Sequence, residues 1–281
     1  MRSLSALSPL GGGRAFLYKA VITSTTNIQV KRIRALRADQ KARRSERLLV
    51  LEGVRLVTEA LAAGAKLQLA LYAPDQLART PDGLGLLEQL DGRAGCFPAS
   101  EQVVAAAADT VTPQGVVGLV AWPVLAARPG LRLVLDGIQD PGNVGTLLRS
   151  AEAAGVGEVL CAQGVADAYS PKVVRAAMGA HFALPLRVDL SWEQLGMVLA
   201  DASLIYAASA TASMPYYAAD WRQPAALIIG SEVHGVSEAG LALTTHHISI
   251  PMLGRAESLN AAVAGSVILF EALRQRSRGR S

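Results

Sequence analysis

The chain has 281 residues, of which 51% are hydrophobic and 18% are charged, so it can bury a sizeable core and is not a disordered chain. Its formal net charge of +4 permits a polyanionic partner without requiring one. The two cysteines cannot form a disulfide framework and favour a reducing cytoplasm. The four histidines show no metal-ligand spacing. No apolar run approaches the roughly 18 residues of a membrane span.

Residues 1–20 are rich in Gly, Ser and Pro and contain no acidic side chain. A transit peptide would require an amphipathic helix, which Pro9 and the glycines at positions 11–13 would break. We therefore expect this segment to be a disordered leader or the product of an upstream start codon.

Positive charge is concentrated in residues 22–55, which contain nine of the 27 Lys and Arg residues. Val30, Ile33 and Leu36 recur at helical spacing, which predicts a helix with one apolar stripe and a basic face. A charged face is usually just solvated, but the excess here makes contact with a phosphate backbone at least as reasonable. The candidate RNA-binding residues are Lys31, Arg32, Arg34, Arg37, Arg43 and Arg44.

Two α/β regions are predicted on either side of a linker. Strands at 48–51, 67–72 and 116–122 alternate with helices, which indicates a small sandwich over residues 21–122. Pro123 and the sequence Arg-Pro-Gly at 128–130 indicate a linker at 123–130. Residues 131–281 would form the second region, with strands at 131–135, 158–161, 184–188, 204–208, 225–229 and 247–250 and helices at 143–154, 171–179, 191–200 and 258–274.

The segment 131–156 is predicted to be a buried strand, a tight polar loop and a helix. Asn143 is expected to cap the helix, because its side-chain oxygen can accept from a first-turn N–H, and Gly155 is expected to end it. Open α/β sheets bind ligands in such loops at the carboxyl ends of strands. Arg149 lies within the helix and, taken alone, would be interpreted as a solvated or ion-paired residue.

Two further polar loops follow predicted strands. The loop 230–235 reads GSEVHG, whose glycines allow close backbone approach to a ligand beside the carboxylate of Glu232. The loop 251–258 leads into Ser-Leu-Asn, where Ser258 is expected to cap the last helix and Asn260 needs hydrogen-bond partners. Each loop alone could be an ordinary turn. The absence of G-x-G-x-x-G and G-x-x-x-x-G-K-[ST] patterns disfavours dinucleotide and P-loop sites.

Together the three loops give the ordered patterns N-x-G-x-x-x-R, G-x-E-x-x-G and S-L-N within residues 131–274. This set resembles the motifs of the SpoU (TrmH-type) branch of the SPOUT RNA methyltransferases. The sequences LLVLEG at 48–53 and TPQG at 112–115 resemble the family's L30e-like substrate-binding domain. Val233 and His234 depart from the small residues often found in the second motif, at variable positions.

The resemblance implies an α/β protein with two domains: a C-terminal SPOUT domain containing a deep trefoil knot, and a smaller N-terminal L30e-like domain. It also implies a homodimer, RNA as partner and S-adenosylmethionine as cofactor, which agrees with the cytoplasmic location expected from the cysteines and the expected lack of a metal. Backbone groups near the second and third loops would hold the cofactor. The residues this assigns to cofactor binding are Leu227, Ile229, Gly230, Ile250, Met252, Gly254 and Leu259.

The implied reaction is methyl transfer to a ribose 2′-hydroxyl, with Arg149 at that hydroxyl. Free arginine is far too weak an acid to serve as a base, so we assign Arg149 the task of positioning and polarising the hydroxyl. The other catalytic candidates would orient Arg149, the ribose and the loops, and they are Asn143, Glu232, Ser258 and Asn260.

Large-subunit (23S) rRNA is the favoured substrate, because a compact N-terminal domain with a basic helix suits structured RNA read by shape and backbone. Transfer RNA is the alternative within the family. A non-catalytic RNA-binding protein is a second alternative, although the presence of all five polar motif residues argues against it. An unrelated α/β enzyme with another nucleotide cofactor would require the three-motif match to be a coincidence.

Overall fold

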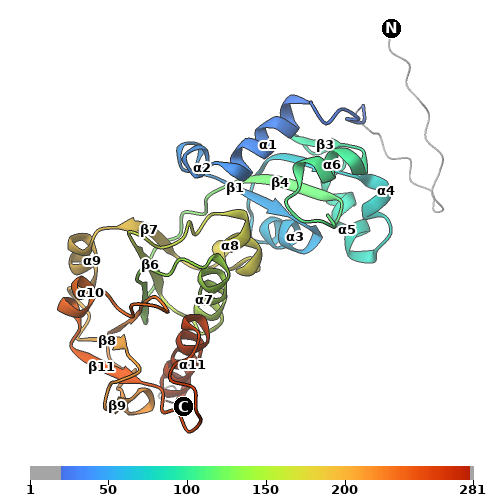
Figure 1. Ribbon diagram of the computed structural model, residues 1–281. Helices are drawn as coiled ribbons and strands as arrows, with labels where there is room; N and C mark the ends of the chain where they lie inside the picture. The colour runs from blue at the N-terminus through green and yellow to red at the C-terminus, as the bar shows by residue number, and fades with distance from the viewer. Residues whose placement is uncertain (1–19, 279–281) are drawn as a thin grey trace.

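The computed structural model describes residues 20–278, which form two α/β lobes built on separate sheets (Figure 1). The predicted leader at 1–20 lies outside the described residues except for Ala20. The predicted linker at 123–130 falls in a segment without helix or strand between the two lobes. No helix within the described residues is both long and apolar enough to cross a membrane.

The N-terminal lobe contains a four-stranded sheet in the order β1-β4-β2-β3, in which β4 is antiparallel to both of its neighbours and β2 pairs with β3 in parallel. Its elements, in chain order, are α1 (Ile28–Ala38), α2 (Gln40–Glu46), β1 (Leu48–Glu52), α3 (Val54–Ala62), β2 (Leu67–Tyr72), α4 (Pro74–Leu77), α5 (Pro81–Leu90), β3 (Cys96–Pro98), α6 (Glu101–Ala107) and β4 (Val116–Ala121).

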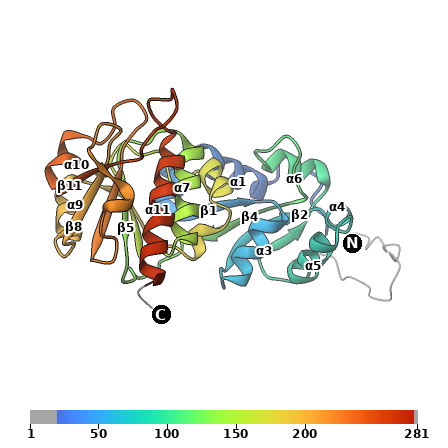
Figure 2. The same ribbon diagram turned by 90° about the horizontal axis from the view of Figure 1, so that it is seen from below.

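Helices cover both faces of this sheet, with α1 and α6 on one face and α3 and α5 on the other (Figure 2). The predicted apolar stripe of α1 is confirmed, because Val30, Ile33 and Leu36 are fully buried. They pack on the face of β1 that presents Leu48 and Val50. The exposed basic side chains of α1, Lys31, Arg32 and Arg34, lie on its outer side.

The C-terminal lobe contains a seven-stranded sheet, all parallel, in the order β7-β6-β5-β10-β8-β11-β9. Its elements are β5 (Arg132–Leu135), α7 (Pro141–Ala153), β6 (Glu158–Ala162), α8 (Pro171–Ala176), the 3-10 helix η1 (Ala180–Phe182), β7 (Leu186–Leu190), α9 (Trp192–Leu199), β8 (Leu204–Ala208), β9 (Met214–Pro215), the 3-10 helix η2 (Tyr216–Ala218), β10 (Ala225–Ile229), α10 (Glu238–Leu243), β11 (His246–Ser249) and α11 (Ala261–Arg278).

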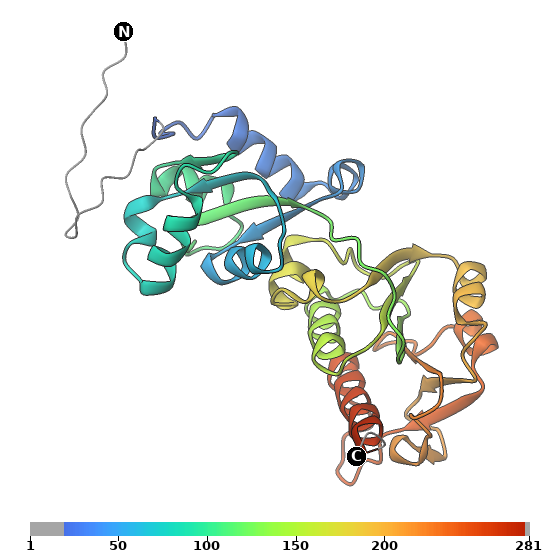
Figure 3. The same ribbon diagram turned by 180° about the vertical axis from the view of Figure 1, so that it is seen from behind.

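The central strands β5, β6 and β10 are buried on both faces of the parallel sheet, as their continuous apolar runs require. Leu133 and Leu135 of β5 face α7 and α11, whereas Val134 packs with residues of α9. Helices α7 and α11 pack against each other on one face. Helix α8 lies next to the N-terminal lobe (Figure 3). Because every strand is parallel, the loops after β5, β10 and β11 leave the same edge of the sheet, as predicted.

Two predicted helix caps are wrong. Helix α7 is capped by Asp140, whose side chain accepts from the Asn143 N–H at 2.9 Å. The helix begins earlier because Pro141 has no N–H to satisfy and a backbone angle already suited to the first helical position. Helix α11 starts at Ala261 and is capped by Asn260 rather than Ser258, since Asn is an equally good cap directly before the apolar run.

Other differences are small. The predicted strand at 184–188 lies two residues later, because η1 occupies the chain just before it, and the helix predicted at 171–179 ends at Ala176. The predicted helix end at Gly155 is confirmed, with φ of +67° after the helix. Short elements such as β3 and α10 were not predicted, because they contain too few residues to show a period.

Gly145 provides a test of the contact between α7 and α8. A Cβ at this position would lie 2.4 Å from the Cβ of Ala176 and 2.9 Å from the carbonyl oxygen of Val173. We expect Gly145→Ala to lower the free energy of unfolding by about 1–3 kcal/mol through overpacking. The matched control is Gly85→Ala in α5, which meets nothing within 4 Å and should raise stability by about 0.5–1 kcal/mol. Chemical denaturation of both variants measures the difference; equal effects would contradict the close contact.

Candidate functional site

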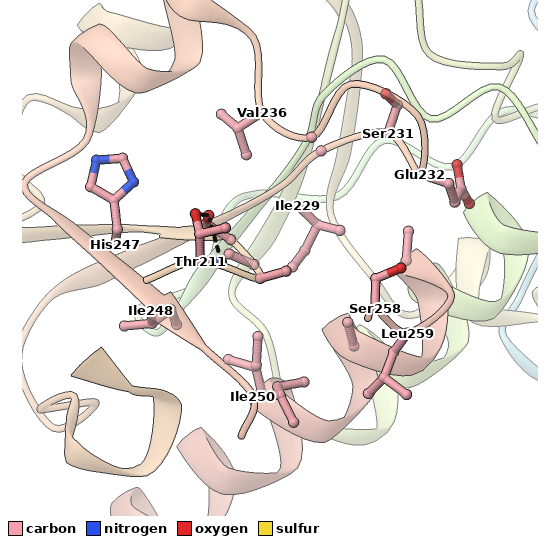
Figure 4. A pocket seen from close by; sticks show the side chains of 18 of the residues that line it. Thr211, Ile229, Ser231, Glu232, Val236, His247, Ile248, Ile250, Ser258 and Leu259 are labelled. Carbon is pink, nitrogen blue, oxygen red and sulfur yellow. Dashed lines mark hydrogen bonds between the residues drawn. The ribbon is translucent and has the colours of Figure 1, made fainter. Parts of the chain in front are cut away.

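A cavity of about 550 Å³ lies at the carboxyl ends of β8, β10 and β11, next to the start of α11 (Figure 4). Its walls are mainly apolar, and Glu232 and Ser258 contribute polar groups. Residues that line it include Ser209, Thr211, Ile229, Gly230, Ser231, Glu232, His234, Val236, His247, Ile248, Ile250, Met252, Glu257, Ser258, Leu259, Ala261 and Ile268. Its size is that of a pocket for a small-molecule ligand.

The structure brings most of the predicted cofactor-binding residues to this cavity. Those that line it are Ile229, Gly230, Ile250, Met252 and Leu259. Leu227 does not line it, because its side chain is buried in the core of the lobe two residues before the end of β10. Gly254 lies in the exposed loop beyond Met252 and is not part of the lining either.

The loop after β8 was missed in the sequence. Ala208, Ser209, Ala210 and Thr211 line the cavity because β8 pairs with both β10 and β11. A signal was present, since Ser209 and Thr211 directly follow the predicted strand at 204–208. The strand order, which decides whether that loop reaches the site, is not readable from the sequence.

The loop after β10 is a closed turn. Ser231 and Gly235 exchange backbone hydrogen bonds of 3.0 and 2.9 Å, and the His234 N–H donates to the Ser231 Oγ at 3.1 Å. A Cβ on Gly230 would lie 2.0 Å from the carbonyl carbon of Gly235, so this position has no room for a side chain. The turn therefore holds Glu232 at its tip, beside the cavity.

A hydrogen-bonded chain joins the three motifs. The Asn260 Oδ1 accepts from the N–H groups of Ala262 and Val263 at 2.9 and 3.2 Å, at the start of α11. The Asn260 Nδ2 donates to the Asn143 Oδ1 at 3.0 Å, and the Asn143 Nδ2 donates to the Glu232 Oε1. Because the cap fixes which way the Asn260 amide points, it also sets the direction of the next two bonds.

The other two predicted catalytic residues lie apart from this chain. Ser258 is exposed and lines the cavity. Arg149 is exposed on α7, about 9 Å along the helix from Asn143 and about 120° around it. No hydrogen bond or ion pair joins Arg149 to another residue of 20–278, and it does not line the cavity. Its guanidinium is therefore available to a ligand from outside.

The predicted RNA-binding residues are divided by the structure. Lys31 and Arg34 are exposed on α1. Four of the arginines instead bind protein groups: Arg32 pairs with Glu46, Arg37 donates to the carbonyl oxygens of Ala107 and Ala108, Arg43 pairs with Asp167, and Arg44 pairs with Asp189. Arg43 is only 4% exposed, so its side chain is not available to contact RNA.

Neither cysteine lines the cavity or is suited to covalent catalysis by a thiol. Burial raises the pKa of the Cys161 thiol to about 12, so the nucleophilic thiolate is scarce near neutral pH. Cys96 is also buried. Across residues 20–278, no group of three His, Cys, Asp or Glu side chains is placed to hold a metal ion.

Comparisons with known proteins match both lobes. The model of the SpoU rRNA Methylase family matches residues 130–270. The model of the MRM3-like substrate binding domain matches residues 27–118.

Similar proteins cover nearly the whole chain. An uncharacterized tRNA/rRNA methyltransferase of Synechocystis is 35% identical over 92% of this chain and 94% of its own. The 23S rRNA (guanosine(2553)-2′-O)-methyltransferase of Bacillus subtilis is 31% identical over 89% and 97%. The crystal structure of the SpoU methyltransferase AviRb from Streptomyces viridochromogenes with the cofactor AdoMet has a TM-score of 0.79 at 28% identity, covering 89% and 98%.

Substitutions at Asn260 separate its cap from its bond to Asn143. We expect Asn260→Ala to lower the free energy of unfolding by about 1 kcal/mol, because two N–H groups of α11 lose their acceptor. Asn260→Ser keeps a good cap and should restore most of that stability, although its short side chain cannot replace the donor to Asn143. Thermal and chemical unfolding of both variants measure this; equal losses would show that the cap is not the source of stability.

Proposed function

The chain belongs to the SpoU rRNA methylase family, and we propose that it transfers a methyl group from S-adenosylmethionine to a ribose 2′-hydroxyl of 23S rRNA. The observation that carries the proposal is the hydrogen-bonded chain Glu232–Asn143–Asn260, because it joins all three family motifs beside one cavity. The name of the Bacillus subtilis relative, a 23S rRNA 2′-O-methyltransferase, supports the substrate.

The cavity fits S-adenosylmethionine. Ile229, Ile250 and Leu259 offer an apolar wall for a purine ring, and the backbone of residues 251–258, which forms no hydrogen bond to another described residue, leaves donors and acceptors for polar groups. The carboxylates of Glu232 and Glu257 suit a cationic ligand. When bound, the cofactor supplies a methyl group made electrophilic by its sulfonium.

The protein's own residues would then orient the acceptor. Arg149 carries a permanent charge and fixed donors, so it would hold the ribose hydroxyl and the adjoining phosphate. Glu232 would be kept in place by Asn143, and Asn143 by Asn260, so that the loops do not move as the RNA enters. Ser258 would contact the ribose or the loops from its exposed position. Orientation of this kind can account for a large part of a rate enhancement.

The N-terminal lobe would hold the RNA. Its match to the MRM3-like substrate binding domain and the exposed Lys31 and Arg34 support this role. Structured RNA is read largely through shape and backbone, which suits a lobe with exposed basic side chains.

We also propose that the protein is a cytoplasmic homodimer and that the C-terminal domain of each subunit contains a deep trefoil knot. Val263 and Phe270 of α11 are each 48% exposed, and Leu253 of the adjacent loop is fully exposed. Apolar side chains of this kind on one helix and its loop support burial by a second copy. Because α11 lies beside α7, such an interface would bring Arg149 close to the partner subunit and complete the RNA site.

The test of the function is a map of 2′-O-methylation across total rRNA and tRNA from cells with and without the gene. Loss of one site in 23S rRNA is the expected result. Loss of a site in tRNA instead would assign the alternative substrate. If no site changes and the purified protein does not bind S-adenosylmethionine, the chain is an RNA-binding protein without catalytic activity.

Arg149→Ala should lower methyl transfer by about 10²-fold or more, because the hydroxyl loses its positioning group. Affinity for S-adenosylmethionine, measured by calorimetry, should be unchanged, since Arg149 does not line the cavity. The control is Arg79→Ala, which removes an exposed arginine paired with Glu101 in the other lobe and should leave transfer unchanged. Loss of cofactor binding in Arg149→Ala would show that Arg149 acts in cofactor binding and not in positioning the hydroxyl.

Charge reversal of Lys31 and Arg34 should weaken RNA binding and reduce the slope of log affinity against log salt by about 1 for each residue. Affinities measured at several salt concentrations give this slope. Arg222→Glu is the control, because Asp220 already pairs with that side chain. An unchanged slope in the Lys31 and Arg34 variants would indicate that the outer side of α1 is an ordinary solvated face and does not contact RNA.

A further inference from the structure

Arg43 of α2 is a buried cation that joins the two lobes. Its Nε and one terminal nitrogen donate to the Asp167 Oδ2 at 3.1 and 2.6 Å. Its other terminal nitrogen donates to the carbonyl oxygens of Leu36 and Arg37 at 2.7 and 2.8 Å. These two carbonyls belong to the last turn of α1, where the helix leaves acceptors without partners. The side chains of Arg43 and Asp167 are 5% and 13% exposed.

Asp167 lies at the edge of the sheet that holds the candidate site. It follows the carboxyl end of β6, which pairs with β5. The neighbouring Ala166 N–H donates to the Ile138 carbonyl oxygen at 2.9 Å, in the loop that leads to the Asp140 cap and to Asn143. The ion pair is therefore linked through backbone to the first motif.

A second contact between the lobes is centred on α8. Arg175 donates to Asp109 at 2.7 Å. Tyr169 stacks on Trp122 with ring centroids 3.8 Å apart, and the Tyr169 N–H donates to the second carboxylate oxygen of Asp167 at 3.1 Å. Two attachments, at α2 and at α8, oppose rotation of one lobe against the other, which a single contact would permit.

We propose that the Arg43–Asp167 pair is a positioning device: it docks the substrate-binding lobe at one angle on the edge of the sheet, so that bound RNA reaches Arg149 in register. This inference rests on the proposed methyl transfer. A buried ion pair is weak evidence for stability, because desolvation offsets its Coulomb energy; in some proteins its fixed geometry instead provides conformational specificity, and that is the role we assign here. The planar arginine fork, with one side on Asp167 and the other on the end of α1, provides that geometry.

The test uses the full chain and Asp167→Asn, an isosteric change that removes the charge. Asp189→Asn is the matched control, because it removes the same charge from the pair of Asp189 with Arg44, which also joins the two lobes but is exposed and therefore contributes little. Spin labels on Lys66→Cys and Met197→Cys, both exposed and on different lobes, report the distance between lobes. We expect a narrow distance distribution in the parent and the control and a broad one in Asp167→Asn.

Kinetics separate positioning from folding. In Asp167→Asn, kcat for a structured 23S rRNA fragment should fall by about 10²-fold, the effect of a small misplacement of reacting groups. Affinity for S-adenosylmethionine should remain that of the parent, and Arg43→Lys, which keeps the charge but not the fork, should give an intermediate kcat.

An unchanged distance distribution and kcat in Asp167→Asn would overturn the proposal. A fall in kcat accompanied by loss of cofactor affinity would also overturn it, because the pair would then serve folding. If the parent chain methylates no RNA, the proposed function fails, whereas the distance measurement still decides whether the pair sets the angle between the lobes.

Discussion

The arrangement of the site depends on the cap that Asn260 provides to α11. Because its amide oxygen accepts from two N–H groups of the helix, its nitrogen must point away and donate to Asn143. Asn143 then has only its nitrogen left for Glu232. A local requirement of helix termination thus orients three side chains that are far apart in the sequence, and Asn260 is at once a structural residue and part of the site.

The sequence predicted the longer strands and helices and the edge at which the polar loops meet, because hydrophobic periodicity and punctuation are local signals. Helix starts were less predictable, since Asp140 and Asn143, like Ser258 and Asn260, are all good caps and only the fold selects between them. The contribution of Ser209 to the cavity could not be predicted from the sequence, because it depends on the order of the strands in the sheet.

The basic segment shows the same limit more clearly. Nothing within residues 22–55 distinguishes an arginine that faces solvent from one that binds another lobe. The partner of Arg43 lies 124 residues away and that of Arg44 lies 145 residues away. Charge density in a sequence therefore indicates how much positive charge is available, and the tertiary structure decides how much of it remains for a polyanion.

The order of strands in the C-terminal sheet has a consequence for how the protein is made. Strand β10 lies between β5 and β8 although it is synthesised after both, so the two halves of the sheet are joined only when β10 is added. Pairing of strands so distant in the chain is intrinsically slow. The hydrogen bond from Asn260 to Asn143 likewise spans 117 residues. The hydrogen-bonded chain that joins the three motifs therefore cannot form before residue 260 has been synthesised.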